Sequence, residues 1–551
     1  MNTREILTLQ FGHYSNFVGS HWWNVQELGF EYNTNTDNPS EINHDVFYRE
    51  GQTNKREVTY TPRLLLTDLK GSLKSLPQQG YLYDPPVDPN KFETCWHSEV
   101  AIEEEEKIAK NEYQKEIDNP AEPKIEYNLE DSVDVWSDFL YARFHPRTVN
   151  VINEYQHESE ETPFNIFPVG QKLWETDYFK EDYADKIRSN VEECDNFQGF
   201  QILLDANDAF GGLAMSCMEY ICDEYENKSI FALPLIPSYY KDYSYTTEEE
   251  SRKSGVNDQM RLINLGLCYN MLIENSSVFV PLSTSGVGWK TSSQPRSFNH
   301  VNYKPESWYH SSAILASALD TFTLKYRLKN TCYSLSDFAV DLTPYGRKAT
   351  AASICLPFSL NTGGYLIDCL DNWEGPLTQS ITPNCTIGSS RLMQLYTLRG
   401  VGANQLKKPS SVAGKQLDMP AYRCNTIDEM LSMYLAYTCH ASASNVTSVS
   451  KGLQVKKPFP DIFDKRVGRN GNIIADDRNP DMSVQSVPIM TGLHSGSEIG
   501  NMIESLHTAM NNIKIARFQQ YASAGLEKDE YNECLAKLFD FRELYDDNYV
   551  L

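Results

Sequence analysis

The sequence predicts an α/β protein built on a parallel sheet, and two stretches carry that prediction. Residues 4–10 alternate apolar and polar side chains as a strand does, and Gly12 separates them from a helical segment containing Trp22 and Trp23. Residues 197–204 have the pattern of a strand, 213–225 that of a helix and 230–234 that of the next strand. Strand, loop, helix and strand form a right-handed crossover unit, so both stretches predict parallel strands. The turns at the carboxyl edge of such a sheet can hold an anion.

The composition is that of a large globular protein. A chain of 551 residues with 40% hydrophobic side chains predicts two or three structural units with sizeable cores. The net charge of −26 disfavours non-specific binding to nucleic acid. The 12 cysteines include no C-x-x-C pair, which is typical of reduced thiols in a cytosolic protein. No apolar run approaches the ~18 residues of a membrane-spanning helix, and the N-terminus resembles neither a signal peptide nor a transit peptide.

Next in order, a short strand is predicted at 45–48, a turn at 51–55 and a buried strand at 60–68 that ends in Asp68. Asp68 is a candidate to reach a metal ion through water. Two residues later comes Lys70, a cation that a hard divalent ion does not accept as a ligand, so we expect no metal site. Lys70 can either offset phosphate charge or lie in a surface turn before Gly71.

Two charged stretches interrupt the pattern. Residues 88–134 are dense in Glu, Lys, Asp and Pro, with four consecutive glutamates at 103–106, and predict an exposed insertion that is partly helical or disordered. Residues 448–470 hold a basic patch. It is either a solvated loop or a contact for acidic lipid headgroups or acidic protein tails. Its members are Lys451, Lys456, Lys457, Lys465, Arg466 and Arg469.

A phosphate at the carboxyl edge of the sheet would contact the loop that follows the strand at 197–204. Wrapping a phosphate takes bare glycine backbone, but residues 207–213 are Asn-Asp-Ala-Phe-Gly-Gly-Leu. Asp205 and Asp208 place negative charge beside any anion, and Phe210 adds bulk. The loop therefore predicts poor binding of a nucleotide triphosphate.

The remaining elements follow in order. Helices are predicted at 256–273 and 308–326, a strand at 277–280 and a flexible loop at 283–300 without Walker spacing. Residues 350–447 are predicted to alternate short strands and turns, most clearly at 354–358 and 365–370. Charged helices are expected at 496–510 and 529–549, and neither the acids of the middle region nor His440 has a catalytic spacing.

Residues 12–19, together with His21, Trp22 and Trp23, resemble the Misato family of tubulin-like proteins, and residues 198–201 and 518–531 resemble tubulins. The resemblance covers almost the whole chain. It implies a tubulin-like α/β fold with a Rossmann-like nucleotide-type domain at 1–305, interrupted by the acidic insertion, and a central helix at 306–330. A second α/β domain is implied at 331–490, with a strand at 338–345, and C-terminal helices are implied at 491–551.

The resemblance also implies a remnant GTP site. Its candidate residues are Gly12, Asn16, Asp68, Gly211 and Tyr309, the last at the position of a tyrosine that contacts guanine. Ala313 replaces an asparagine that contacts the same base. Cys332 and Ser334 fall where tubulins carry the Asn and acid of their catalytic loop, and the nearest acid is Asp337. We therefore expect no catalytic residue and no GTP hydrolysis by that mechanism.

Two functions follow as hypotheses. By resemblance, the first is a non-catalytic protein that acts in mitochondrial distribution and morphology and in microtubule and spindle assembly through protein partners. Those partners would be tubulin, tubulin-folding factors or mitochondrial-shaping factors, and the location would be the cytoplasm and the mitochondrial outer membrane, held peripherally. This function needs no cofactor. The alternative is a divergent switch or slow GTPase that binds GTP or GDP through Gly12, Asp68, Lys70 and Gly211. Tubulin-type filament formation is a third idea, which the changed loop disfavours.

Overall fold

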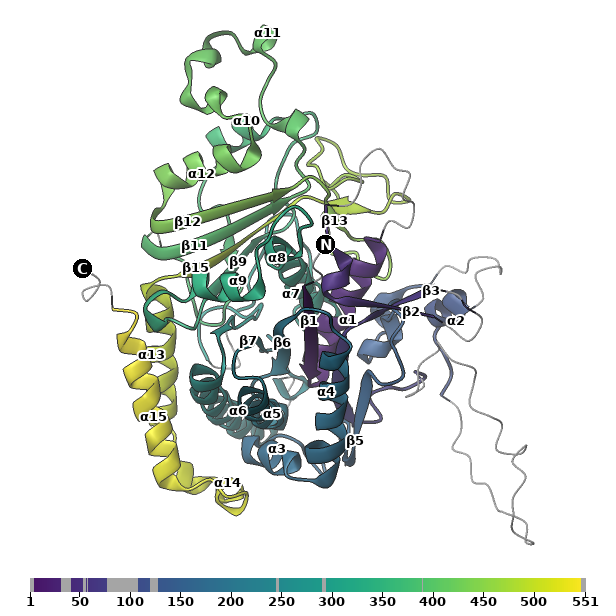
Figure 1. Ribbon diagram of the computed structural model, residues 1–551, viewed down its shortest axis with the longest axis vertical. Coiled ribbons are helices and arrows are strands. Elements are labelled where there is room, and N and C mark those ends of the chain that lie inside the picture. The colour runs from purple at the N-terminus through teal and green to yellow at the C-terminus, as the bar shows by residue number, and fades with distance from the viewer. Residues whose placement is uncertain are drawn as a thin grey trace.

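The computed structural model describes residues 4–30, 41–52, 56, 58–76, 108–118, 127–243, 247–289, 294–388 and 390–546. The body has two sheets, one in the lower half of Figure 1 and one in the upper half, with long helices packed around the first. Residues 53–55, the glutamates at 103–106 and the last residues of the helix predicted at 529–549 lie outside the described ranges.

The first sheet carries the candidate site. In the described part of the chain its order is β5-β4-β1-β6-β7-β8, and every neighbouring pair is parallel. From β1 the chain leads to β4 on one side, and β6 lies on the other side. The ends of these three strands therefore form the switch point where α/β proteins bind ligands. The strands are β1 (Glu5–Phe11), β4 (Leu64–Lys70), β5 (Val149–Gln156), β6 (Phe197–Asp205), β7 (Ser229–Leu235) and β8 (Val278–Phe279).

Helices cover both faces of this sheet, and the strands alternate between two cores. Leu64 and Leu66 belong to one core, whereas Leu65 belongs to the other, as the period of two in a strand requires. The first core contains α1 (His13–Leu28), α7 (Trp308–Phe322) and α9 (Leu335–Leu342). The second contains α3 (Phe167–Trp174), α5 (Ala209–Glu224), α6 (Glu248–Asn275), α13 (Ser497–Asn511) and α15 (Lys528–Glu543), the last two side by side in yellow in Figure 1.

The second sheet has the order β10-β9-β15-β11-β12 among the described residues, and only β11 and β12 pair in parallel. Its strands are β9 (Ala351–Cys355), β10 (Gln379–Ser380), β11 (Ser390–Arg399), β12 (His440–Val449) and β15 (Ile489–Ser495). α10 (Leu366–Asp371) and α12 (Ile427–Thr438) pack on it over a separate small core. Strand β15 includes residue 490, which the resemblance gave as the end of the second α/β domain.

Smaller elements complete the body. β2 (Tyr48–Gln52) and β3 (Val58–Pro62) pair as an antiparallel ribbon, as do β13 (Leu453–Gln454) and β14 (Ser486–Val487). The short helices are α2 (Glu112–Asp118), α4 (Ala184–Glu192), α8 (Leu324–Arg327), α11 (Ser410–Ala413) and α14 (Gln519–Ser523). Within the described ranges, no helix is long and apolar enough to cross a membrane.

Several local predictions were wrong. The strand expected at 338–345 is α9, because Ser334 and Asp337 form a capping box that starts a helix. The piece at 365–370 is α10 and not a strand, and α12 was not expected at all. The strand at 45–48 is a 3-10 turn, His44–Val46, followed by β2. The strand at 60–68 is split between β3 and β4.

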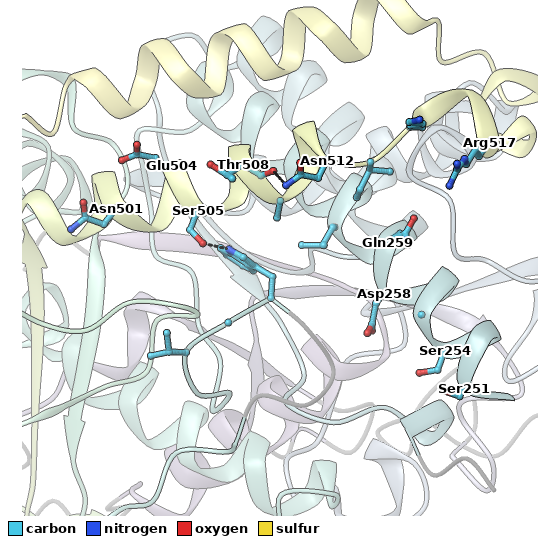
Figure 2. Close-up of a pocket in the computed structure, with 18 residues that line it drawn as sticks. Ser251, Ser254, Asp258, Gln259, Asn501, Glu504, Ser505, Thr508, Asn512 and Arg517 are labelled. Carbon is cyan, nitrogen blue, oxygen red and sulfur yellow. Dashed lines mark hydrogen bonds between the residues drawn. The ribbon is translucent and has the colours of Figure 1, made fainter. Parts of the chain in front are cut away.

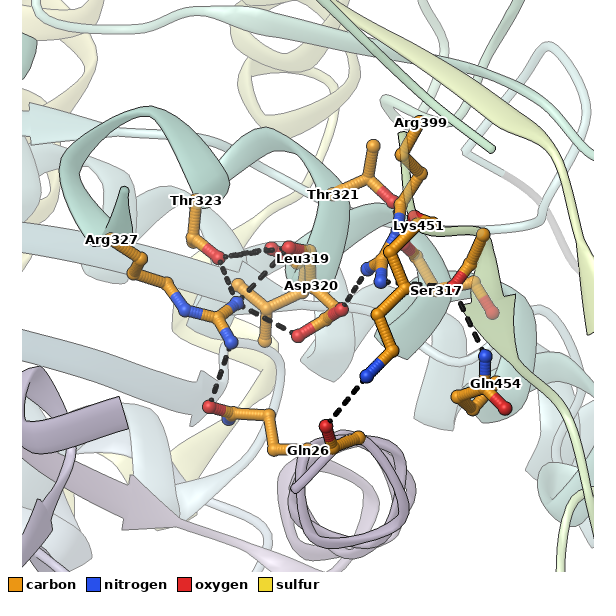
Figure 3. Close-up of polar contacts among 12 residues, drawn as sticks. Gln26, Ser317, Leu319, Asp320, Thr321, Thr323, Arg327, Arg399, Lys451 and Gln454 are labelled. Carbon is orange, nitrogen blue, oxygen red and sulfur yellow. Dashed lines mark hydrogen bonds and ion pairs between the residues drawn. The ribbon is translucent and has the colours of Figure 1, made fainter. Parts of the chain in front are cut away.

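A buried charge network joins the two halves of the body (Figure 3). The Asp320 carboxylate at the end of α7 accepts hydrogen bonds from Arg327 and from Arg399 of β11. Arg327 also donates to Gln26 of α1 over 2.9 Å, and Arg399 donates to the carbonyl of Lys451. Asp320, Arg327 and Arg399 are each no more than 3% exposed. Burial raises the pKa of Asp320, but the two guanidinium groups outweigh it, so the pKa lies below its usual value.

Candidate functional site

The candidate site lies at the carboxyl edge of the parallel sheet, where β1, β4 and β6 end. Gly12 sits between β1 and α1 with φ 115°, a backbone conformation that L side chains rarely adopt. A Cβ at Gly12 would also overlap the carboxyl group of Asp205, which ends β6. Gly12 is therefore required here for close packing against Asp205.

Asp205 occupies the anion position at the start of α1. Its Oδ2 accepts from the backbone N–H of Tyr14 over 2.9 Å, and its Oδ1 accepts from the N–H of Ser15 over 2.7 Å. Helix N-terminal N–H groups and the helix dipole favour an anion at this place. Asp205 is 4% exposed. Burial and the neighbouring Asp208 raise its pKa well above the usual value. The anion site of α1 is thus filled from within the chain.

Asp208 does the same at the start of α5. Its Oδ1 accepts from the N–H of Phe210 over 2.8 Å, so Asp208 is the N-cap of a helix that begins at Ala209. Burial raises the pKa of Asp208 to about 8, against the effect of the N–H groups of Phe210 and Gly211. The segment that would wrap a phosphate is the cap and first turn of a helix.

The glycines of this segment serve helix packing. A Cβ at Gly212 would overlap the carbonyl of Phe167, and a Cβ at Gly170 of α3 would overlap the carbonyl of Ala209. Gly211 faces the carbonyls of Asp205 and Ala206 at 3.2 and 3.3 Å from an added Cβ. α3 and α5 therefore cross at backbone distance.

Asp68 is fully engaged by protein donors. Its Oδ2 accepts from Trp136 Nε1 over 2.7 Å and from Asn16 Nδ2 over 3.0 Å, and lies 3.1 Å from His13 Nδ1. Its Oδ1 accepts from the N–H of Leu69. Burial opposes ionisation of Asp68, but His13 and Asn16 outweigh it and lower the pKa. Among the described residues, no group of three or more His, Cys, Asp and Glu side chains is arranged to hold a metal ion.

Aromatic side chains fill the space beside Asp68. The His13 ring lies 4.0 Å from the His157 ring between centroids, and 6.0 Å from that of Trp308. Trp308 also packs against Tyr14 and Phe17 and donates to the carbonyl of Tyr239 over 2.9 Å. Burial, with His13 as the next cause, lowers the pKa of His157 to about 4. The residues present do not fit a nucleotide held in the tubulin manner.

Two family models match this chain. A Misato Segment II tubulin-like domain matches residues 4–119, and a tubulin domain matches residues 126–328. Protein misato from Drosophila melanogaster is 36% identical over 578 aligned positions, covering 100% of both chains. The chain belongs to the Misato family. Protein misato homolog 1 is 32% identical in Danio rerio, covering 98% of this chain and 97% of that one. In Homo sapiens it is 31% identical and the coverage is 98% of each.

The Misato-family membership and the tubulin-like α/β fold confirm the resemblance seen in the sequence. The structure brings Gly12, Asn16 and Asp68 together, and places Gly211 beside the backbone of Asp205. Tyr309 lies apart from them. Its hydroxyl donates to the carbonyl of Pro458 over 2.5 Å, and its ring packs against His21 and Phe139.

Sequence reasoning missed His13, Trp136 and Trp308 as members of this site. The only signal for them is their place on α1, before β5 and at the start of α7, which the tertiary fold brings together. Asp337, the acid nearest to the catalytic-loop position, accepts from the N–H of Ser334 over 2.8 Å as a helix cap. Lys70 is exposed, with no ion pair among the described residues.

A groove of about 1210 Å³ lies between α6 and α13 (Figure 2). Figure 2 shows Asn501, Ser505 and Thr508 of α13, with Asn512 at its C-cap, on the side that faces Asp258 and Gln259 of α6. Trp289 donates to Ser505 over 2.9 Å inside it. Glu504 pairs with Arg542 and Asp258 with Arg261, whereas Lys514 and Arg517 have no ion pair within the described ranges. The uncompensated charges of the groove are therefore positive.

One cation of the predicted basic patch is engaged inside the protein. Lys451 is half-buried and donates to the carbonyl of Gly29 over 2.9 Å. Lys456, Lys465 and Arg466 are exposed and form no ion pair with a described residue. Lys457 lies 4.8 Å from the centre of the Tyr127 ring.

Proposed function

We propose that this Misato-family protein is a non-catalytic, tubulin-like adaptor that works without a bound nucleotide. The observation that carries the proposal is the Asp205 carboxyl group seated on the N–H groups of Tyr14 and Ser15. A phosphate bound there would have to displace Asp205 and lie beside Asp208. Displacement would leave the buried Asp205 carboxyl group without its two N–H donors, at a cost of about 1–3 kcal/mol for each bond left unmade. The alternative of a GTP-binding switch needs this displacement, and no described contact favours it.

The cellular role in this proposal is the organisation of mitochondria and of microtubules, including spindle assembly, through protein partners. The location proposed is the cytoplasm and the outer face of mitochondria. The exposed cations Lys456, Lys465 and Arg466 support peripheral contact with anionic headgroups. Family resemblance supports the role and the location.

The partner surface in this proposal is the groove between α6 and α13. Polar side chains of α6 and α13 line the groove, and Lys514 and Arg517 form no ion pair with a described residue. These features fit an acidic polypeptide segment, so we propose the acidic tail of tubulin as its occupant. Exposed cations steer an acidic partner and set its salt dependence.

The decisive experiment for the nucleotide is to denature the purified protein and assay the released base, then to titrate GTP and GDP with and without Mg²⁺. We expect no stoichiometric nucleotide and no binding below millimolar concentration. Stoichiometric GDP or GTP in the purified protein would reverse the interpretation of Asp205, and the switch would become the leading function.

The partner surface is tested by co-sedimentation with purified tubulin. The double charge reversal Lys514→Glu with Arg517→Glu is expected to weaken binding about tenfold or more. The control reverses Arg252 and Lys253, which are exposed on α6, one of the two helices that border the groove, but do not line it. Equal binding by both double variants, or by tubulin whose tails have been removed, would refute this surface.

A further inference from the structure

A small cavity in the second domain has features of a ligand site. It has a volume of about 270 Å³ and lies between the start of β11, residues 375–378 and the C-terminal end of α12. The apolar wall of the cavity is formed by Leu377, Tyr434 and Leu435. The exposed Thr438 lies at the rim of the cavity. Ligand pockets of small molecules begin at about this size, are mostly apolar and carry a few placed polar groups.

Arg391 is the charged group of this cavity, and it is only 9% exposed. Its Nε donates to the carbonyl of Gly388 over 3.1 Å, and its Nη1 donates to Gln394 Oε1 and to the Tyr396 hydroxyl, each over 2.9 Å. Its Nη2 has no acceptor in the described part of the chain. Arg391 also has no carboxylate within ion-pair distance there.

The side chains that contact Arg391 among the described residues carry no negative charge; the carboxyl group of Glu498 lies near Gly388 but forms no ion pair with Arg391. His494 donates or accepts through Nε2 at 2.7 Å from Ser353 Oγ, and burial together with Arg391 holds its pKa well below the usual value. Burial raises the pKa of Tyr396, so its hydroxyl stays protonated. A buried guanidinium without a counter-charge is costly. The buried Arg327 and Arg399, by contrast, share the carboxylate of Asp320.

We propose that this cavity binds a small organic carboxylate. The carboxylate accepts from Nη2 of Arg391, and the apolar body of the ligand packs against Leu377, Leu435 and Tyr434. A single guanidinium matches a single negative charge. The C-terminal end of α12, which is the negative end of the helix dipole, borders the cavity; it opposes any anion and opposes a phosphate dianion more than a carboxylate.

The test uses benzoate as the probe, with benzyl alcohol as its neutral analogue and inorganic phosphate as the alternative anion, titrated by calorimetry and ligand-observed NMR. We expect benzoate to bind about tenfold or more tightly than either. Arg391→Gln should weaken benzoate binding about tenfold or more. Arg188→Gln, at an exposed arginine of α4, should leave it unchanged.

A second variant keeps the proposal testable if Arg391→Gln does not fold. Thr438→Trp fills the rim of the cavity and leaves every contact of Arg391 in place, so it should abolish benzoate binding. Benzoate binding that equals that of benzyl alcohol, or that persists in both variants, would overturn the site. Tighter binding of phosphate would overturn the ligand class.

Discussion

Replacing Asp205 by alanine directly tests the role of this carboxyl group at the start of α1. The change removes the acceptor of two buried N–H groups, those of Tyr14 and Ser15. A buried donor left unsatisfied costs about 1–3 kcal/mol, and removal of a buried carboxyl group with a raised pKa offsets part of that loss. We expect the free energy of unfolding to fall by about 2–4 kcal/mol. Asp205→Asn keeps one acceptor and should lose about half as much.

The assay is urea unfolding followed by tryptophan fluorescence, repeated in formate and in chloride at equal ionic strength. Formate is the group that Asp205→Ala deletes, so it can bind the freed N–H groups of α1. Formate at about ten times its Kd should return about 1.4 kcal/mol to the variant and nothing to the natural chain. Asp223→Ala, at an exposed position of α5, is the control. A variant as stable as the natural chain, or an equal formate effect on both, would refute the internal anion.

Three further predictions follow from described contacts. Asp320→Asn leaves Arg327 and Arg399 without their shared carboxylate and should lower the free energy of unfolding in urea by about 3–5 kcal/mol. Because the folded pKa of Asp320 is lowered, the stability that its carboxylate contributes is full above about pH 4 and is lost as the pH falls through the folded pKa. The pKa of Asp208 is raised to about 8, so the folded chain binds more protons than the unfolded one between about pH 4 and pH 8, and stability should fall as the pH rises through that window; Asp208→Asn, which keeps a helix cap, should flatten this slope. Gly212→Ala should lower the melting temperature, because its Cβ meets the Phe167 carbonyl and overpacking costs about 1–3 kcal/mol. Gly255→Ala, on α6 where an added Cβ meets open space, should instead raise stability by up to about 1 kcal/mol. Equal effects of the two glycine variants would contradict the close crossing of α3 and α5.

The sequence predicted the parallel sheet well because local signals and the fold agree there. Alternation in β1 and β4, and the crossover from β6 through α5 to β7, are patterns that tertiary contacts only reinforce. α10 was predicted as a strand because short apolar runs of about 4–8 residues do not separate helix from strand by periodicity. α9 was expected to be a strand from the resemblance to tubulins. The capping box at Ser334 was the available signal for α9, and it was not used.

At the candidate site, the sequence predicted that Asp205, Asp208 and Phe210 would disfavour a phosphate. It could not predict that Asp205 fills the place of the anion, because its partners Tyr14 and Ser15 are about 190 positions away in the chain. The resemblance placed Tyr309 where a tubulin tyrosine contacts guanine. In the structure its hydroxyl donates to the carbonyl of Pro458, which lies in a loop far along the chain. Contacts of this range depend on the packed fold, and a single sequence carries no pattern for them.

The internal carboxylates change what holds this tubulin-like body together. A ligand that binds only the folded state adds to stability in proportion to its concentration over its Kd. Here N–H groups at the starts of α1 and α5 are satisfied by Asp205 and Asp208 of the chain itself, so they need no nucleotide as an acceptor. The buried Asp320 network then joins α1, α7 and β11 without a ligand as well. In the proposed function, a body completed in this way has no γ-phosphate to sense, and changes in its activity come from partners that bind its surface.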